Sequence, residues 1–160
     1  RVYINTDIIG TQLGACLKNV LAIAAAISDG LGCGANARAA IITRGLAEMV
    51  RLADAIGAKR NTLNGLAGLG DLVLTATDDQ SRNRKFGLCL GQGMSVEQAY
   101  AEVGQVVEGA RAVKSLMHLI KQYNLELPIS TQVFFIIEQG LAPKEAVKNL
   151  LSRLPTEEIL

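Results

Sequence analysis

Hydrophobic positions near the start of the chain recur at the spacing of an α-helix. Between Asp7 and Asp29, apolar residues fall three and four positions apart, which places them on one helical face. These residues are Ile9, Leu13, Leu17, Val20, Ala24 and Ile27. The glycine-rich stretch at 30–34 then interrupts the pattern. The spacing predicts one long helix over residues 7–29.

A second helical pattern covers Ala37 to Ile56. Asn36 is a residue type that caps helix starts, and Gly57 stands where a glycine commonly ends a helix. The apolar stripe of this helix is Ile42, Leu46, Met49, Ala53 and Ile56. Two ion pairs are expected on its outer face, Arg44 with Glu48 and Arg51 with Asp54.

Residues 58–93 have a different pattern, in which six glycines separate short helical pieces. Polar residues cluster between Thr75 and Lys85, and this part of the chain is expected to be its most loop-rich. A helix is predicted to start near Ser81, whose side chain suits an N-cap.

The remaining chain predicts four further helices. The string Ser95-Val96-Glu97-Gln98 is a capping-box pattern that opens a short helix to about residue 102. Further helices are expected over 110–123, over 129–139 with Gly140 after it, and from Pro143 to about 153. The only strand-like segment is residues 1–4, which resembles a strand cut from something upstream. The sequence therefore predicts an all-α domain of six to eight helices, taken from a longer chain.

Composition narrows the class of protein. The chain has 160 residues, of which 49% are hydrophobic and none is tryptophan, which fits a single domain with an aliphatic core. A formal net charge of +1, without runs of like charge or a basic stripe, argues against a nucleic-acid partner.

The cysteines and the most apolar segment indicate a cytoplasmic protein. Cys16, Cys33 and Cys89 are widely spaced and odd in number, which fits neither a disulfide framework nor a zinc site. No metal site is expected. The apolar segment from Leu13 to Ile27 contains Lys18 and is too short to cross a bilayer comfortably, so no membrane span is expected.

Lys18 lies on an unusual face of the first predicted helix. The other residues at helical spacing on that face are all small: Gly10, Gly14, Ala22 and Ala25. Small residues let another backbone approach closely, and the lysine would then project into the gap in a partly desolvated setting that suits proton transfer. A lysine that extends from a helix interface into solvent is the alternative.

Ser81, Arg82 and Asn83 form a candidate anion site. Unpaired N–H groups and the positive end of the dipole make a helix start attractive to phosphate, and arginine adds a forked donor. An ordinary capped helix start is the alternative. The glycines at 65–70 and at 30–34 do not match a nucleotide-binding fingerprint, because no strand precedes either stretch. His118 has no second histidine with which to share a metal and is expected in packing or at the surface.

Several longer strings, in this order, resemble bacterial NAD(P)-dependent glycerol-3-phosphate dehydrogenase. They are residues 13–20 (LGACLKNV), 36–40 (NARAA), 43–45 (TRG), 65–71 (GLAGLGD), 80–87 (QSRNRKFG) and 104–109 (GQVVEG). The resemblance begins where the C-terminal domain of that family begins. It implies an all-helical fold like that of the 6-phosphogluconate dehydrogenase C-terminal domain over residues 1–160. It also implies that a Rossmann domain, missing from this chain, binds NAD or NADP.

The resemblance also implies roles for individual residues. Lys18 corresponds to the catalytic proton acceptor, and Lys18, Asp71, Ser81, Arg82 and Asn83 correspond to glycerol 3-phosphate ligands. Arg82, Val106 and Glu108 correspond to residues near the nucleotide. The implied reaction interconverts sn-glycerol 3-phosphate and dihydroxyacetone phosphate, a step in phospholipid precursor metabolism.

The chain alone is expected to be inactive, because it lacks the domain that binds the cofactor. The resemblance is compatible with a homodimer, but the sequence does not settle the oligomeric state. Two alternatives to this function remain open at this point. The first is a related two-domain oxidoreductase acting on another hydroxy acid or phosphorylated sugar. The second is a helical binding or dimerisation module without catalysis.

Overall fold

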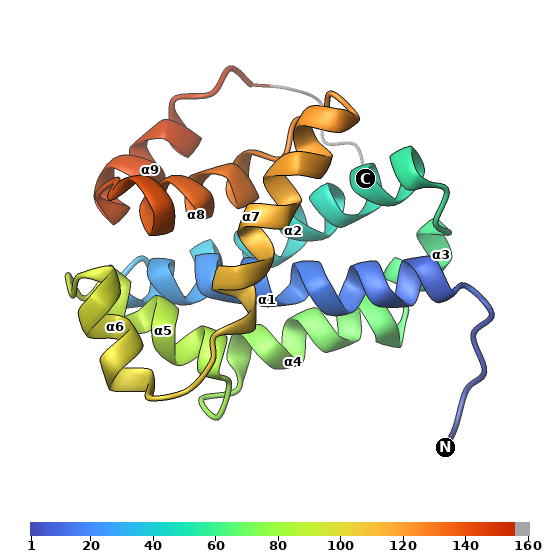
Figure 1. Ribbon diagram of the computed structural model, residues 1–160, viewed down its shortest axis with the longest axis horizontal. Coiled ribbons are helices and arrows are strands. Elements are labelled where there is room, and N and C mark those ends of the chain that lie inside the picture. The colour runs from blue at the N-terminus through green and yellow to red at the C-terminus, as the bar shows by residue number, and fades with distance from the viewer. Residues whose placement is uncertain (156–160) are drawn as a thin grey trace.

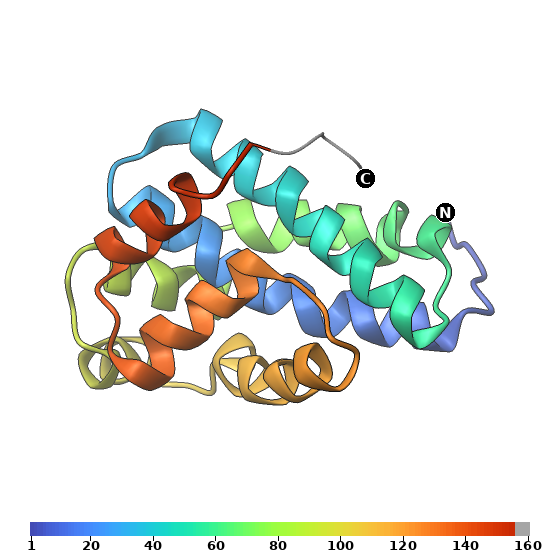
Figure 2. The same ribbon diagram turned by 90° about the horizontal axis from the view of Figure 1, so that it is seen from above.

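The computed structural model describes residues 1–155 and is helical in every regular element of that range (Figures 1 and 2). These residues form nine α-helices and one π-helical turn, more than the six to eight helices expected. The strand expected at residues 1–4 is wrong, since these residues have no regular secondary structure. The elements are α1 (Ile8–Gly30), α2 (Gly34–Ile56), α3 (Arg60–Leu63), η1 (Leu66–Gly70), α4 (Asp71–Thr77), α5 (Arg82–Gly91), α6 (Val96–Val103), α7 (Glu108–Gln122), α8 (Pro128–Gln139) and α9 (Pro143–Leu151).

Helix α1 is the centre of the fold. Figure 1 shows α4 and α5 beneath it, and Figure 2 shows α2 and α7 on its two sides. The expected stripe is buried from Leu13 onward, but Ile9 is exposed. Every residue from Val20 to Ser28 is buried, because neighbours surround this half of the helix. By length and composition alone α1 could cross a membrane, yet 56% of its most apolar window is buried by the other helices, as in the core helix of a folded domain.

Asp7 fixes the start of α1. Its carboxylate accepts hydrogen bonds from the backbone N–H groups of Gly10 and Lys59, both at 2.9 Å. These donors favour the ionised form and hold the pKa of Asp7 below its ordinary value of 3.8. Asp7 therefore caps α1 and also ties it to the segment before α3.

We expect this cap to make stability depend on pH in the acid range. A lowered pKa in the folded state means that the stabilisation by Asp7 is complete above pH 3.8 and is lost as the pH falls through the folded value. The variant Asp7→Asn keeps a capping side chain without the charge. Its melting temperature should lie below that of the unmodified chain at neutral pH, and the gap should close on acidification. A gap that stays constant with pH would contradict this role of the charge.

Helix α2 differs from expectation at its start and on its surface. It begins at Gly34, three residues earlier than expected, and the residue before it, Cys33, makes no side-chain cap, so the predicted cap at Asn36 is wrong. Its end at Gly57 is confirmed, with φ 78° in the left-handed region that favours glycine. Neither expected ion pair forms: Asp54 pairs with Arg60, and Glu48 is buried.

The buried Glu48 holds the start of α8. Its carboxylate accepts hydrogen bonds from the backbone N–H groups of Ile129 at 2.5 Å and Ser130 at 3.1 Å, and from the Ser130 hydroxyl at 2.7 Å. Burial raises the pKa of Glu48, and the three donors oppose that rise. A carboxylate at a helix start satisfies N–H groups that have no partner within the helix. Glu48 therefore joins α2 to α8.

Replacing Glu48 by alanine should destabilise the fold by about 2–3 kcal/mol, because it leaves buried donors without an acceptor. Urea unfolding would measure this. Glu145→Ala is the matched control, since Glu145 forms only an exposed pair with Lys148, and it should change stability by less than about 0.5 kcal/mol. Equal effects of the two substitutions would show that the buried cap contributes little.

Residues 58–93 contain more helix than their glycines suggest. Helices α3, α4 and α5 and the turn η1 occupy most of this range, and several of the glycines lie inside these elements, against other backbone segments. The predictions for the later helices are confirmed within a few residues. The capping box of Ser95 and Gln98 forms at α6, and α8 ends at Gly140, which has φ 68°.

Candidate functional site

A cleft of about 570 Å³ opens where α1, α4, α5 and the start of α7 meet. It contains six of the seven residues expected at the site: Lys18, Asp71, Ser81, Arg82, Asn83 and Glu108. The other lining residues are Ala15, Asn19, Leu74, Thr75, Asp78 and Gln80. Segments far apart in the sequence thus bring the expected residues to one place.

Lys18 meets a carboxylate in this cleft. Its Nζ lies 2.5 Å from Oδ2 of Asp71, and the two side chains are 20% and 33% exposed. The expected partial desolvation of Lys18 is confirmed, and so is the close approach of another backbone along its helix face. Asp71 is the first residue of α4, and its backbone carbonyl accepts a hydrogen bond from the Thr75 hydroxyl at 2.7 Å. The amine therefore sits within reach of the cleft, held by a carboxylate that is itself fixed on a helix.

The expected anion site lies at the start of α5. Ser81 is the N-cap, and its hydroxyl accepts a hydrogen bond from the backbone N–H of Arg84. Asn83 is buried and links three helices: its amide donates to Asn19 at 3.0 Å, and its carbonyl oxygen accepts from the Gly109 N–H at 2.8 Å. Both polar groups of Asn83 are thus engaged within the chain, although its amide nitrogen carries a second N–H.

Arg82, the first residue of α5, forms an ion pair with Glu108. Its guanidinium donates to the carboxylate of Glu108, the first residue of α7, and lies 3.4 Å from Oε1 of Gln105. Both side chains of the pair are 43% exposed. Exposed pairs of this kind contribute little to stability, so a stronger anion can compete with Glu108 for Arg82.

Val106 is the one expected residue outside the cleft lining. It is exposed and lies in the short connection before α7, two residues from Glu108. Its side chain presents an apolar surface to solvent, close in sequence to the charged edge of the cleft.

Asn19 and Thr75 also line the cleft, although neither is among the site residues expected from the sequence. A signal for Asn19 is its position next to Lys18, but it bonds to Asn83 and to the Ala15 carbonyl rather than to the lysine. The signal for Thr75 is its spacing, since it lies four residues after Asp71 on the same helix face.

Arg84, a buried arginine next to the cleft, joins several of the elements that form it. Arg84 donates to Asp29 at 2.5 Å, to Asp79 at 2.9 Å and to the backbone carbonyl of Ala76 at 3.1 Å. Asp29 also accepts from Arg38 at 2.8 Å. These bonds tie the ends of α1 and α4 to the first turn of α5, which carries Arg82 and Asn83.

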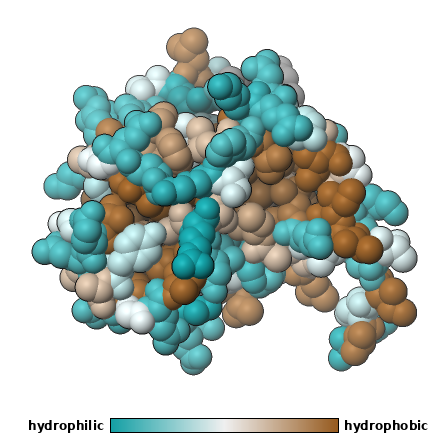
Figure 3. All heavy atoms as spheres, in the orientation of Figure 1, coloured by the Kyte–Doolittle hydropathy of each residue, from teal (hydrophilic) through white to brown (hydrophobic). Residues whose placement is uncertain are grey.

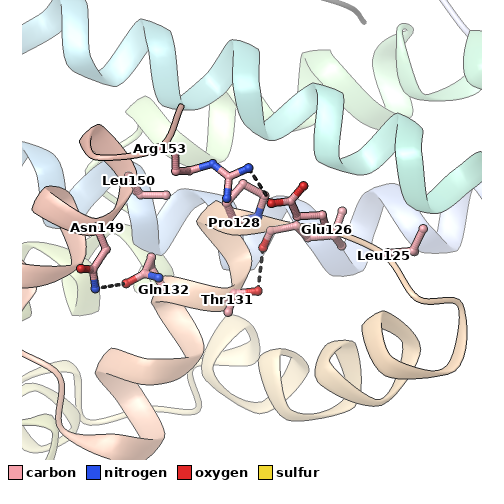
Figure 4. Close-up of a pocket in the computed structure, with 9 residues that line it drawn as sticks. Leu125, Glu126, Pro128, Thr131, Gln132, Asn149, Leu150 and Arg153 are labelled. Atoms are coloured by element: carbon pink, nitrogen blue, oxygen red, sulfur yellow. Dashed lines mark hydrogen bonds and ion pairs between the residues drawn. The ribbon is translucent and has the colours of Figure 1, made fainter. Parts of the chain in front are cut away.

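A second cavity of about 240 Å³ lies away from this cleft, between the start of α8 and the end of α9 (Figure 4). Its polar side chains pair with one another. Arg153 pairs with Glu126 at 2.6 Å, and Asn149 bonds to Gln132 at 3.3 Å. The cavity therefore lacks a group poised for chemistry.

Other candidate centres are weaker. Within residues 1–155, no three His, Cys, Asp or Glu side chains come together as metal ligands. His118 is exposed, with Nδ1 3.0 Å from the Lys114 carbonyl oxygen. Cys16, Cys33 and Cys89 are all free thiols.

Comparison with known families gives one match that covers most of the chain. Residues 7–148 match the family described as NAD-dependent glycerol-3-phosphate dehydrogenase C-terminus. A glycerol-3-phosphate dehydrogenase [NAD(P)+] of Photobacterium profundum is 60% identical over 153 residues, which are 96% of this chain and 45% of the relative. The corresponding protein of Methylococcus capsulatus is 58% identical over 158 residues, 99% of this chain and 47% of the relative. The chain thus spans a little under half the length of these curated relatives.

Solved structures give the same result for the fold. A glycerol-3-phosphate dehydrogenase from Coxiella burnetii has a TM-score of 0.92 at 52% identity, over 96% of this chain and 47% of its own. One from Saccharomyces cerevisiae has a TM-score of 0.81 at 26% identity, over 92% of this chain and 43% of its own. The all-helical fold expected from the resemblance is therefore confirmed.

Proposed function

Because the chain belongs to the family of NAD-dependent glycerol-3-phosphate dehydrogenase C-terminal domains, we propose that the full-length protein interconverts sn-glycerol 3-phosphate and dihydroxyacetone phosphate. The role of this chain is to bind the phosphorylated substrate and to move a proton at its C2 oxygen. One observation carries the proposal: a partly buried lysine and a helix start bearing an exposed arginine line the same cleft.

Lys18 is the proton-transfer group in this proposal. During oxidation the neutral amine takes the proton from the C2 hydroxyl, and during reduction the ammonium polarises the C2 carbonyl and then protonates the oxygen. Asp71, 2.5 Å from Nζ, keeps the amine in place for either direction. A lysine pinned by a carboxylate on a second helix loses little freedom when the substrate binds.

The phosphate group lies at the start of α5. Arg82 offers a fork of donors that matches phosphate oxygens, and the first turn of α5 adds N–H groups and the positive end of the helix dipole. Phosphate then replaces Glu108 as the partner of Arg82. Ser81 and Asn83 support this turn from either side, Ser81 as its cap and Asn83 through its bond to α7.

The residues near the cleft fit one edge of a dinucleotide. Arg82, Glu108 and the exposed Val106 supply a charged donor, an acceptor and an apolar contact at one side of the cleft. NAD or NADP, when bound, supplies or accepts the hydride. The glycine stretches of this chain do not form the strand–loop–helix unit that holds a pyrophosphate, so we assign most of the nucleotide contacts to a Rossmann domain preceding this one.

Exposed apolar side chains on this domain are suited to contact with another domain or subunit. Leu74 lines the cleft and is 60% exposed, and Leu66 at 70% lies on the turn that leads into α4. Figure 3 shows another apolar area where α1 begins, in keeping with exposed Ile8 at 68%. We assign these surfaces to the preceding domain and to a second subunit. The free thiols fit a reducing compartment, and we place the protein in the cytoplasm.

Steady-state assays of the full-length protein test the proposed reaction. Oxidation of NADH or NADPH should occur with dihydroxyacetone phosphate and be far slower with dihydroxyacetone, which lacks the phosphate. The present chain alone should show no turnover, because it would hold only one edge of the nucleotide. Equal rates with another phosphorylated sugar or hydroxy acid would indicate a different oxidoreductase, and no turnover with any substrate would favour a binding module.

A further inference from the structure

The helix face that carries Lys18 lies against one continuous segment of the chain, from α3 through η1 to α4. Residues 10, 14, 18 and 22 are spaced by four and share a face of α1. Successive contacts advance together along both segments: Gly14 lies against Ala67, Lys18 pairs with Asp71, and Ala76 clusters with Ala22 and Ala25. The position of Asp71 is thus set by how this segment is aligned on α1.

Gly14 is the tightest point of this contact. A Cβ atom at residue 14 would collide with the carbonyl oxygen of Ala67 and lie 3.2 Å from its carbonyl carbon and 3.5 Å from Cα of Gly68. All three atoms belong to the backbone, so no rotamer change can make room. Any side chain at this position must push η1 away from α1.

A shift of η1 passes directly to Asp71. The turn is π-helical, with the Gly70 N–H bonded to the Gly65 carbonyl at 3.1 Å, and α4 begins with Asp71 immediately after it. Turns of this kind are rare and are frequently found at functional sites. The far end of α4 is fixed, because Ala76 is buried against α1 and its carbonyl accepts from Arg84. Movement is therefore concentrated at the end of α4 that meets Lys18.

We propose that Gly14 is a positioning residue for proton transfer: its missing side chain lets η1 lie on α1 and so places the Asp71 carboxylate against Lys18. This inference rests on the function proposed for Lys18. Gly14 touches no substrate and acts only through Asp71.

The test is Gly14→Ala in the full-length protein. We expect kcat to fall roughly 10- to 100-fold, the loss that follows from displacing a catalytic group by about 1 Å. The pH profile of kcat should also change, because the carboxylate that holds the proton-transfer group is displaced from it. KM for dihydroxyacetone phosphate should change less than kcat, since Arg82, which holds the phosphate in the proposed function, belongs to a different helix.

Gly91→Ala is the matched control. Gly91 ends α5, and a Cβ there would collide with the backbone carbonyl of Ile27 on α1, far along the helix from Lys18. This variant should lose comparable thermal stability yet keep the kcat pH profile. If both variants lose activity only in proportion to stability, with unchanged pH profiles, Gly14 has a merely structural role and the proposal is overturned.

A deletion of Leu66 covers the case in which Gly14→Ala does not fold. The deletion shortens the π-helical turn that sets Asp71. Leu66 is 70% exposed in this chain, and the variant Leu66→Ala, which removes the side chain but keeps the length of the turn, is the control for any contact that Leu66 makes with the preceding domain or a second subunit. The same fall in kcat is expected of the deletion, and an unchanged kcat and pH profile would overturn the proposal. If Lys18→Ala leaves turnover intact, the function proposed above fails. If only Lys18→Ala abolishes turnover and the Gly14 variant and the Leu66 deletion do not reduce it, the present inference alone fails.

Discussion

Replacement of Lys18 by alanine in the full-length protein lowers kcat by roughly 10²- to 10⁴-fold, the contribution of a positioned acid or base. The physical reason is its place in the cleft, where the amine is 20% exposed and is held at 2.5 Å by Asp71. Cofactor affinity should stay nearly constant, because the lysine acts on the substrate oxygen. Stopped-flow measurement of the hydride-transfer step and titration of NADH fluorescence would separate the two effects.

One further variant shows whether the proton or the charge of Lys18 matters for turnover, and a second variant serves as its control. Lys18→Arg keeps a cation but cannot give up its proton near neutral pH, so it should be almost as inactive as Lys18→Ala. Lys85→Ala removes a lysine that pairs with Glu102 outside the cleft, and it should behave like the unmodified protein. Full turnover by Lys18→Ala would remove the lysine from the mechanism.

Replacement of Arg82 by alanine should lower kcat/KM for dihydroxyacetone phosphate by roughly 10- to 100-fold, the value of charge-assisted hydrogen bonds to an anion. Most of the change should appear in KM. The guanidinium stands at the first position of α5 with Glu108 as its only charged partner in the cleft, and phosphate is the stronger competitor. Steady-state kinetics with and without the substrate phosphate would measure the effect.

Dihydroxyacetone supplies the control for Arg82, since it lacks the phosphate, and its slow reaction should lose far less on the substitution than the reaction of dihydroxyacetone phosphate. Arg82→Lys should fall between the unmodified protein and Arg82→Ala, because a lysine provides the charge without the fork. A loss of equal size on both substrates would mean that Arg82 serves the nucleotide or the fold rather than the phosphate.

Local sequence pattern was sufficient for the elements that carry the site. Asp7 to Asp29 shows the three-and-four spacing of a helix, and the structure has this helix within one residue at either end. Ser81 and Ser95 were recognised as caps because the cap bond involves residues only three positions apart. The small face around Lys18 correctly indicated close approach by another backbone.

Errors arose where a residue's partner lies far along the chain. The spacing of Glu48 to Arg44 predicts a surface pair on the outer face of α2, but the partners of Glu48 are 81 and 82 residues away at the start of α8. The glycines of 58–93 suggested loops, yet several are packing positions where helices touch backbone to backbone. Helical periodicity gives the face of a residue but not the neighbour that covers it.

The spacing of residue types along the chain is enough to show that the chain is helical, which face of α1 is small, and that a lysine stands in the middle of that face. The resemblance to a family adds expected roles for the residues around this lysine. The contact of Lys18 with Asp71, 53 positions away, and the ion pair of Arg82 with Glu108 at the edge of the cleft follow only from the way the helices pack together. The reason is physical: helix formation depends on neighbours within a turn or two, whereas these pairs depend on how η1 lies on Gly14 and how α5 packs on α1.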